Sequence, residues 1–226
     1  MGMMQASGEQ PGLFQGVYSY PEAARLLGVP SKRVARWADG YSFEIKYGRG
    51  RSAPVLQTER YPGVLCFREL MELFFVREYI ALGVKLPHIR STAEALAEQV
   101  GPYPFSASGV LVSGRDLLVR TAEGQLQRPD IGQLVADFAD GFATSVDIRE
   151  DRARRYRPQC FDDKIYLDSE IRGGEAVVTD FAIPTRVVYD LWEKERDLSV
   201  VAGYHDIELE DVSIAVRYEG QWRQAA

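Results

Sequence analysis

The chain has 226 residues, of which 46% are hydrophobic and 27% are charged, and its formal net charge is −6. This composition is typical of a globular protein of one or two domains that buries its core without disulfides. The two cysteines, Cys66 and Cys160, lie far apart without metal-ligand spacing, which favours a reducing cytoplasm. No apolar run reaches the roughly 20 residues that span a bilayer. Residues 1–15 lack the features of a signal peptide, and we expect them to be disordered.

Charge is distributed unevenly along the chain. Residues 20–90 contain 12 Lys and Arg against 7 Asp and Glu, whereas residues 161–226 contain 7 against 15. A basic N-terminal part indicates a phosphate-bearing partner, and an acidic C-terminal part should avoid DNA. An open alternative is that both are ordinary solvated faces.

Residues 20–40 predict two short helices joined by a turn. The first has an apolar stripe and is interrupted at 28–30, where the sequence is Gly-Val-Pro. Ser31 is the expected N-cap of the second helix, which Gly40 ends. Two helices joined by a Gly-containing turn are typical of a helix-turn-helix.

Residues 43–56 predict a β-hairpin, or wing, with a Gly- and Arg-rich tip at 46–51 that lacks acidic residues. The major groove of DNA admits a helix whose first turn reads the bases, and basic side chains of a wing reach phosphates or a narrow minor groove. The candidate DNA-binding residues are Ser31, Lys32, Arg33, Arg36, Lys46, Tyr47, Arg49 and Arg51. The alternative is a helical subdomain that contacts only protein.

The rest of the chain predicts an α+β fold that is mainly helical. Further helices are expected at 67–82, 89–100, 131–138, 184–194, 198–204 and 209–218. Strands are expected at 110–112, 117–119, 144–148, 164–167 and 176–178. The Arg-rich segment 151–158 is interpreted as a connector, either solvated or paired with phosphate or with the acidic tail.

Four regions follow from these patterns. Residues 1–15 are disordered, 16–100 form a winged helix-turn-helix, 101–160 form a β-containing middle, and 161–226 form a C-terminal domain.

Residues 18–100 resemble the winged helix-turn-helix of MerR-type regulators. The resemblance rests on Tyr20, Ala24, Gly28-Val29-Pro30, Trp37, the wing and Ile80-Ala81-Leu82-Gly83. It implies DNA binding. Pro102 and Pro104 interrupt the long dimerisation helix with which such regulators usually continue. One winged helix buries too little surface for tight operator binding, so we expect a homodimer on an inverted repeat.

Residues 165–218 resemble a bacterial domain of unknown function that occurs in VapB-type antitoxins encoded beside PIN-like ribonuclease toxins. The matching positions are Gly174, Ile183-Pro184-Thr185, Ala202, Tyr204 and Ala215, with departures at Ser169, Ala176 and Phe181-Ala182. The resemblance implies a trihelical helix-turn-helix that binds and neutralises a PIN-like ribonuclease, in a chain that represses its own operon. Because this copy of the domain is acidic, we do not expect it to contact DNA.

An acidic surface complements the RNA-gripping face of a ribonuclease, and aromatic side chains supply anchors. The candidate toxin-binding residues are Trp192, Glu193, Asp197, Tyr204, Asp206 and Tyr218. The alternative is that the three aromatic residues belong to the core of the domain, and for Tyr204 we favour this alternative.

The sequence contains no nucleotide-binding loop, metal motif or catalytic constellation. Its two histidines, His88 and His205, are interpreted as surface or packing residues. We therefore expect a non-enzymatic protein without a cofactor. Two alternatives remain: a MerR-like transcriptional regulator without a toxin partner, and, less favoured, an enzyme.

Overall fold

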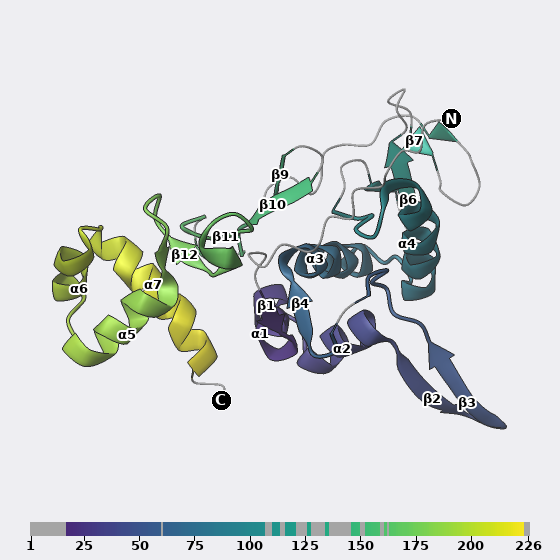
Figure 1. Cartoon of the computed structure of the whole chain (residues 1–226), viewed down its shortest axis with the longest axis horizontal. Helices are drawn as coiled ribbons and strands as arrows, with labels where there is room; N and C mark the ends of the chain where they lie inside the picture. Colours follow the sequence, from purple (N-terminus) through teal and green to yellow (C-terminus); the bar gives the residue numbers. More distant parts are fainter. Residues whose placement is uncertain are drawn as a thin grey trace, which may run out of the picture.

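A computed structural model describes residues 17–59, 61–106, 110–113, 116–120, 126–127, 134–135, 146–149, 152–158, 161 and 163–223. Within these ranges the chain is a mixture of helix and sheet that contains seven α-helices (Figure 1). The expected disordered segment 1–15 lies outside the described residues.

Two short helices, α1 (Tyr20–Leu27) and α2 (Ser31–Asp39), pack against each other near the N-terminus. The Ser19 hydroxyl accepts a hydrogen bond from the backbone N–H of Glu22 at 3.3 Å, and Gly28 ends α1 with a φ of 63°. The predicted helix pair is therefore present. Ser31, however, is the first helical residue rather than the N-cap, a position that Pro30 occupies without a side-chain hydrogen bond.

An antiparallel hairpin, β2 (Tyr41–Ile45) and β3 (Gly48–Ser52), follows α2. The expected tip at 46–51 is too long, because the chain turns at residues 46–47 and Arg49 and Arg51 lie on β3. Gly40 connects α2 to β2 with a φ of +75°, and a Cβ there would lie 2.4 Å from the carbonyl oxygen of Ser52. The junction therefore requires glycine.

Helix α3 (Phe67–Ala81) lies at the centre of the core. It is buried over most of its circumference, and its fully buried side chains include Leu70, Leu73 and Val76. Strand β4 (Val64–Cys66) directly precedes α3 in the chain and pairs antiparallel with β1 (Val17–Ser19). Helix α4 (Leu86–Val100) follows α3.

A buried carboxylate fastens the chain after α4 to α3. Glu72 accepts hydrogen bonds from the backbone N–H groups of Phe105 at 3.1 Å and Ser106 at 2.6 Å. Burial raises the pKa of Glu72 to about 7, although these hydrogen bonds oppose the shift.

A four-stranded antiparallel sheet follows α4, with β5 (Val110–Ser113), β6 (Asp116–Arg120), β7 (Leu126–Gln127) and β8 (Leu134–Val135). The predicted hairpin corresponds to β5 and β6. The helix predicted at 131–138 is wrong at its described residues, since β8 pairs with β7. A short apolar run does not distinguish a strand from a buried helix, and here the pairing partner decides.

A second antiparallel sheet has the order β13-β12-β11-β10-β9. Its strands are β9 (Val146–Arg149), β10 (Arg152–Tyr156), β11 (Ile165–Asp168), β12 (Val177–Val178) and β13 (Ile183–Pro184), and a 3₁₀ turn (Arg172–Gly174) lies between β11 and β12.

The connector predicted at 151–158 is wrong, because residues 152–156 form the strand β10. A register shift between Ala153 and Arg155 lets Ala153 and Tyr156 both face the core, where they are 6% and 1% exposed. Arg155 stays half-exposed and contacts the buried carboxylate of Asp168 at 3.2 Å. Arg154 also pairs with Asp168, so the alternative that this segment pairs with the acidic tail is confirmed for Arg154 and Arg155.

Three C-terminal helices, α5 (Thr185–Glu195), α6 (Leu198–His205) and α7 (Leu209–Arg223), form a compact unit. All three were predicted, and α7 extends five residues beyond its expected end. They share an apolar cluster with Val178 of β12, and its helical members are Val188, Val201, Ala202, Val212 and Ala215.

The main core joins the two ends of the chain. One cluster of buried side chains runs from Tyr18 to Tyr218. The Tyr156 hydroxyl donates to the carbonyl oxygen of Leu26 at 3.0 Å, and the Tyr18 hydroxyl donates to that of Gly174. Around this shared core, the hairpin and α6 project at opposite ends of the long axis (Figure 1).

Candidate functional site

Helix α2 divides into a buried side and a basic side. Val34, Trp37 and Ala38 are 0%, 3% and 1% exposed. Its three basic residues, Lys32, Arg33 and Arg36, are all exposed, whereas Ser31 is half-buried. The apolar stripe therefore anchors α2 in the core and leaves its cations in solvent.

Two contacts fix α2 relative to its surroundings. The guanidinium of Arg36 lies 4.8 Å from the ring centroid of Tyr41, the first residue of the hairpin. At the end of α2, the Tyr20 hydroxyl donates to the two carboxylate oxygens of Asp39 at 2.8 and 2.7 Å. The helix and the hairpin thus present their basic residues as one unit.

The hairpin has two chemically different faces. Because side chains alternate along a strand and paired residues share a face, Tyr41, Phe43 and Ile45 lie on one side, opposite Ser52, Gly50 and Gly48. A Cβ at Gly50 would lie 2.5 Å from the Phe43 ring, so the glycine makes room for that ring. Phe43 and Ile45 nevertheless stay 44% and 52% exposed.

The other face of the hairpin is charged. Arg49 pairs directly with Glu44, and Arg51 pairs with Ser42. The tip carries Tyr47, which is 88% exposed, and the Lys46 ammonium lies 5.4 Å from its ring centroid. Glu44 lies on β2, outside the acid-free tip that the sequence predicts. Glu44 and Arg49 are cross-strand neighbours of opposite charge.

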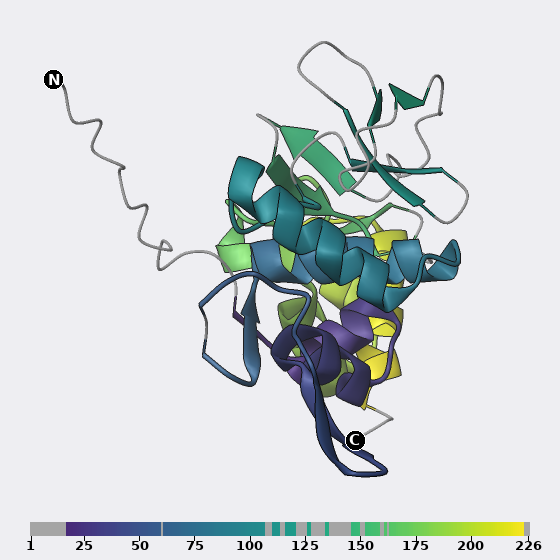
Figure 2. The same ribbon diagram turned by 90° about the vertical axis from the view of Figure 1, so that its right-hand side faces the viewer.

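The structure brings the predicted DNA-binding residues onto two adjoining elements, α2 and the hairpin. Figure 2 shows the hairpin projecting beyond the helices. Sequence reasoning missed Tyr41, Phe43 and Ile45, although their alternation with polar residues was the available signal. Of the eight predicted residues, all but Ser31 are exposed.

The predicted toxin-binding residues divide into exposed and buried groups. Glu193, Asp197 and Asp206 are exposed, and Asp197 also caps α6 by accepting from the N–H of Ser199 at 2.8 Å. Trp192 is half-buried under the guanidinium of Arg196, which lies 4.9 Å from its ring centroid.

Two aromatic expectations are reversed. Tyr204, expected above all in the core, is 75% exposed, because α6 buries only the narrow side that carries Val201 and Ala202. Tyr218 is 4% exposed and packs edge-to-face against Phe161 with ring centroids 5.0 Å apart. Tyr218 is therefore part of the core and is removed from the candidate docking surface.

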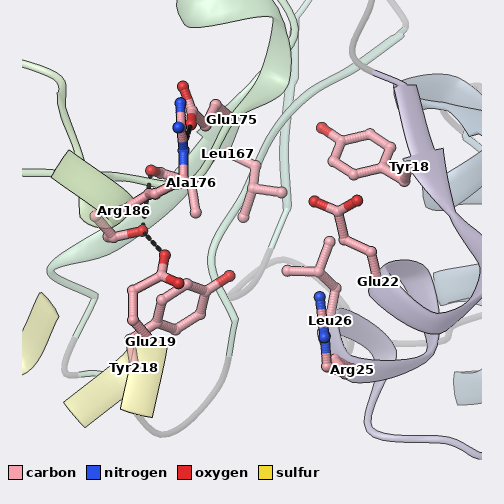
Figure 3. Close-up of a pocket in the computed structure, with 11 residues that line it drawn as sticks. Tyr18, Glu22, Arg25, Leu26, Leu167, Glu175, Ala176, Arg186, Tyr218 and Glu219 are labelled. Carbon is pink, nitrogen blue, oxygen red and sulfur yellow. Dashed lines mark hydrogen bonds and ion pairs between the residues drawn. The ribbon is translucent and has the colours of Figure 1, made fainter. Parts of the chain in front are cut away.

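A cleft of about 360 Å³ lies between α1 and the C-terminal part of the chain (Figure 3). Its lining residues are Tyr18, Glu22, Arg25, Leu26, Leu167, Glu175, Ala176, Thr185, Arg186, Tyr218 and Glu219. Two polar contacts join residues that line the cleft. Arg186 Nε lies 3.1 Å from a carboxylate oxygen of Glu175, and the Thr185 hydroxyl donates to Glu219 at 2.6 Å.

The acidic groups of the cleft influence one another. Burial raises the pKa of the Glu22 carboxyl above its usual value, and the negative charges of Glu219 and Glu175 add to the shift. Arg25 opposes it. The cleft thus has the size and the mixed polarity of a small-molecule site at a junction between two parts of the fold.

Two further properties of the described residues bear on function. Among them, no group of three or more His, Cys, Asp or Glu side chains is arranged to hold a metal ion. None of their helices combines the length and the apolar character that crossing a membrane requires.

No protein-family model matches the chain, but it is similar to a known protein by sequence and to solved structures by fold. A Mycobacterium tuberculosis protein named "Putative antitoxin VapB45" is 29% identical over 112 residues, which is 47% of this chain and 47% of the relative. The match thus spans about half of each protein. The crystal structure of Rv2018 from Mycobacterium tuberculosis superimposes with a TM-score of 0.61 at 20% identity, covering 88% of this chain and 96% of that one. The chain therefore shares its fold with Rv2018 and is similar, over about half its length, to an antitoxin-named protein.

Proposed function

We propose that this chain is an antitoxin that neutralises a PIN-like ribonuclease and represses its own operon by binding DNA. The observation that carries the proposal is the separation of two surfaces at opposite ends of the molecule (Figure 1). The basic surface lies on α2 and β3, and the acidic one consists of exposed carboxylates on α5 and at the two ends of α6: Glu193, Glu195, Asp197 and Asp206. The similarity to an antitoxin-named protein supports the same function. The chain acts in the cytoplasm by binding, not by catalysis.

In this proposal α2, the turn before it and the hairpin work as a winged helix-turn-helix of the MerR type. Lys32 and Arg33 are exposed on the first turn of α2, from which they contact base edges in the major groove. Arg49 and Arg51, on the charged face of β3, contact phosphates. Arg36, held by Tyr41, lies between the two elements.

A single unit of this size buries less surface than a specific operator complex needs. We therefore propose that a homodimer binds an inverted repeat, one unit to each half-site. A monomer in light scattering at micromolar concentration, with one chain per operator, would contradict this part of the proposal.

The C-terminal helices hold the ribonuclease. The first turn of α7 carries the exposed Glu210, where a helix entering a DNA groove needs neutral or basic residues. Exposed carboxylates such as Glu193 and Asp206 instead suit a basic, RNA-gripping protein surface. The acidic end therefore recognises protein, and the basic end recognises DNA.

The test uses the full chain, its operator and the PIN-like ribonuclease encoded beside it. We expect the chain to bind both, and to inhibit RNA cleavage at a one-to-one ratio of chains. Absence of such a neighbouring gene, or uninhibited cleavage with excess chain, would overturn the antitoxin proposal.

The cleft favours a second candidate, a MerR-like transcriptional regulator without a toxin partner. A 360 Å³ cleft between α1 and the C-terminal part is placed to couple a small effector to DNA binding. Operator binding that changes with a small molecule, combined with no effect on the ribonuclease, would favour this function over the first.

A further inference from the structure

Gly203 lies inside helix α6 at a position where the fold itself does not require glycine. Its backbone is helical, and a Cβ built on it meets no atom within 4 Å. Glycine destabilises a helix interior relative to alanine, because its unfolded backbone is more flexible. Gly203 therefore lowers the stability of α6, although no packing contact within the chain requires a glycine there.

The surface around Gly203 is apolar and exposed. Val200 and Tyr204, three residues before and one after it, are 49% and 75% exposed. Residues separated by three or four positions lie on the same side of a helix, so these three form one continuous surface, here called the α6 face. The buried residues of α6, Val201 and Ala202, lie on the other side.

Negative charge borders the α6 face at both ends. Asp197 is exposed immediately before the helix, and Asp206 is exposed immediately after it. Arg196, next to Asp197, is also exposed and keeps its positive charge, and its guanidinium lies over the ring of Trp192 rather than on the α6 face. An apolar strip between two carboxylates fits a protein surface with an apolar centre and a basic rim.

We propose that the α6 face is the docking surface for the basic protein partner, and that Gly203 is the point of closest approach. A residue without a side chain lets the partner's backbone or an apolar side chain lie directly against the helix, between Val200 and Tyr204. The inference rests on the proposed function, because it takes the ribonuclease as the occupant. The location of α6 at the far end of the molecule from the hairpin leaves this face open while DNA is bound (Figure 1).

The test exploits the opposite signs of the two expected effects of Gly203→Ala. The added methyl favours the helix and should raise the Tm of the free chain by about 2 °C. The same methyl occupies the point of closest approach and should weaken binding of the PIN-like ribonuclease at least 10-fold in calorimetric titration. Gly220→Ala in α7 is the matched control, since its Cβ would make only an ordinary 3.8 Å contact with Tyr189. This control should also raise the Tm, but leave affinity unchanged.

The outcomes separate the inference from the function on which it rests. A stabilised Gly203→Ala chain that binds the ribonuclease as tightly as the Gly220→Ala chain overturns the docking surface and leaves the antitoxin function standing. A destabilised Gly203→Ala chain also overturns it, because the glycine would then serve the fold. No binding by the unmodified chain overturns the antitoxin function itself. A photo-crosslinking residue at Tyr204 should link to the ribonuclease, whereas one at Tyr61, which is 85% exposed, should not. The reverse result contradicts the inference.

Discussion

Arg36 and Tyr41 are in contact, with the guanidinium 4.8 Å from the ring centroid. This contact holds a basic side chain of α2 against the first residue of the hairpin, so the two proposed DNA-contacting elements are coupled by a cation–π interaction. Such contacts contribute about 0.5–1 kcal/mol at exposed sites.

Tyr41→Leu tests whether this coupling positions Arg36 for DNA. The substitution keeps an apolar side chain but removes the ring, so operator affinity should fall about 3-fold while the fold is retained. Fluorescence anisotropy with labelled operator measures the change. Tyr61→Leu is the control, because Tyr61 is 85% exposed. Equal affinities for the two variants would show that the contact is not used.

Salt dependence distinguishes phosphate contacts from base contacts. If Arg49 contacts a phosphate, Arg49→Ala should weaken binding to every DNA sequence and reduce the slope of log K against log salt by about 1. If Arg33 reads a base, Arg33→Ala should relax specificity at one operator position and cost about 1–3 kcal/mol. Lys194→Ala, in an exposed cation of α5, should change neither quantity. Unchanged DNA binding by a chain with Arg33, Arg36, Arg49 and Arg51 all replaced by Ala would refute the assigned interface.

The junction between α2 and the hairpin should be intolerant of any side chain. Gly40→Ala would place a methyl 2.4 Å from the backbone oxygen of Ser52 at a φ of +75°, so the backbone must move. We expect a loss of about 3 kcal/mol in the free energy of unfolding, measured in urea. Gly28→Ala carries only the left-handed strain, because its Cβ meets nothing within 4 Å, and should cost about 1 kcal/mol. Similar losses of unfolding free energy in the two variants would contradict the interpretation that the Ser52 carbonyl excludes a side chain at position 40.

Stability should fall as pH rises through the titration of Glu72. Burial raises the pKa of Glu72 to about 7, above the ordinary value of about 4.5 for a glutamate. The folded state therefore keeps a proton that the unfolded state releases, and stability is lost between about pH 4.5 and pH 7. The contribution is on the order of 3 kcal/mol, and Glu72→Gln should remove it from the urea-unfolding profile. Glu94→Gln, in an exposed residue of α4, is the control. A pH profile that Glu72→Gln leaves unchanged would rule out this role.

The two C-terminal tyrosines should respond oppositely to truncation. Tyr218→Ala removes a buried ring that packs on Phe161 and should cost about 3–5 kcal/mol. Tyr204→Ala removes an exposed ring and should change stability by less than about 0.5 kcal/mol, but weaken ribonuclease binding. Urea denaturation measures the stability of each variant, and calorimetric titration measures its affinity for the ribonuclease. A large stability loss in Tyr204→Ala, or a folded Tyr218→Ala chain that alone loses affinity, would contradict the prediction.

Local signals explain which elements could be predicted from the sequence. Gly28 and Gly40 mark the ends of α1 and α2, and Pro184 precedes α5, so these boundaries depend on residues within the same segment. Strand β10 could not be recognised in this way. Its arginines indicate exposure, and the burial of Tyr156 depends on Phe74, whose ring lies 5.1 Å away and 82 positions earlier in the chain.

The candidate site was predictable only in part for the same reason. Exposure of the basic residues of α2 follows from the position of Val34 and Trp37 on the helix. The burial of Tyr218 and the exposure of Tyr204 depend instead on how α6 and α7 pack on the rest of the fold. Glu44, which opposes Arg49, was missed because the strand register was needed to place it.

The hydrogen bond from Tyr18 to Gly174 and the shared apolar cluster join the N-terminal helix pair to the C-terminal part of the chain. A cut between β10 and β11 would leave Tyr156 on the same fragment as Leu26, but would place Gly174, the hydrogen-bond partner of Tyr18, on the other fragment with the C-terminal part of the apolar cluster. Loss of the C-terminal helices would then loosen the helix pair beneath the hairpin, and the basic surface would lose its rigid support. If the proposed function holds, a single cleavage there should therefore weaken operator binding and ribonuclease binding together.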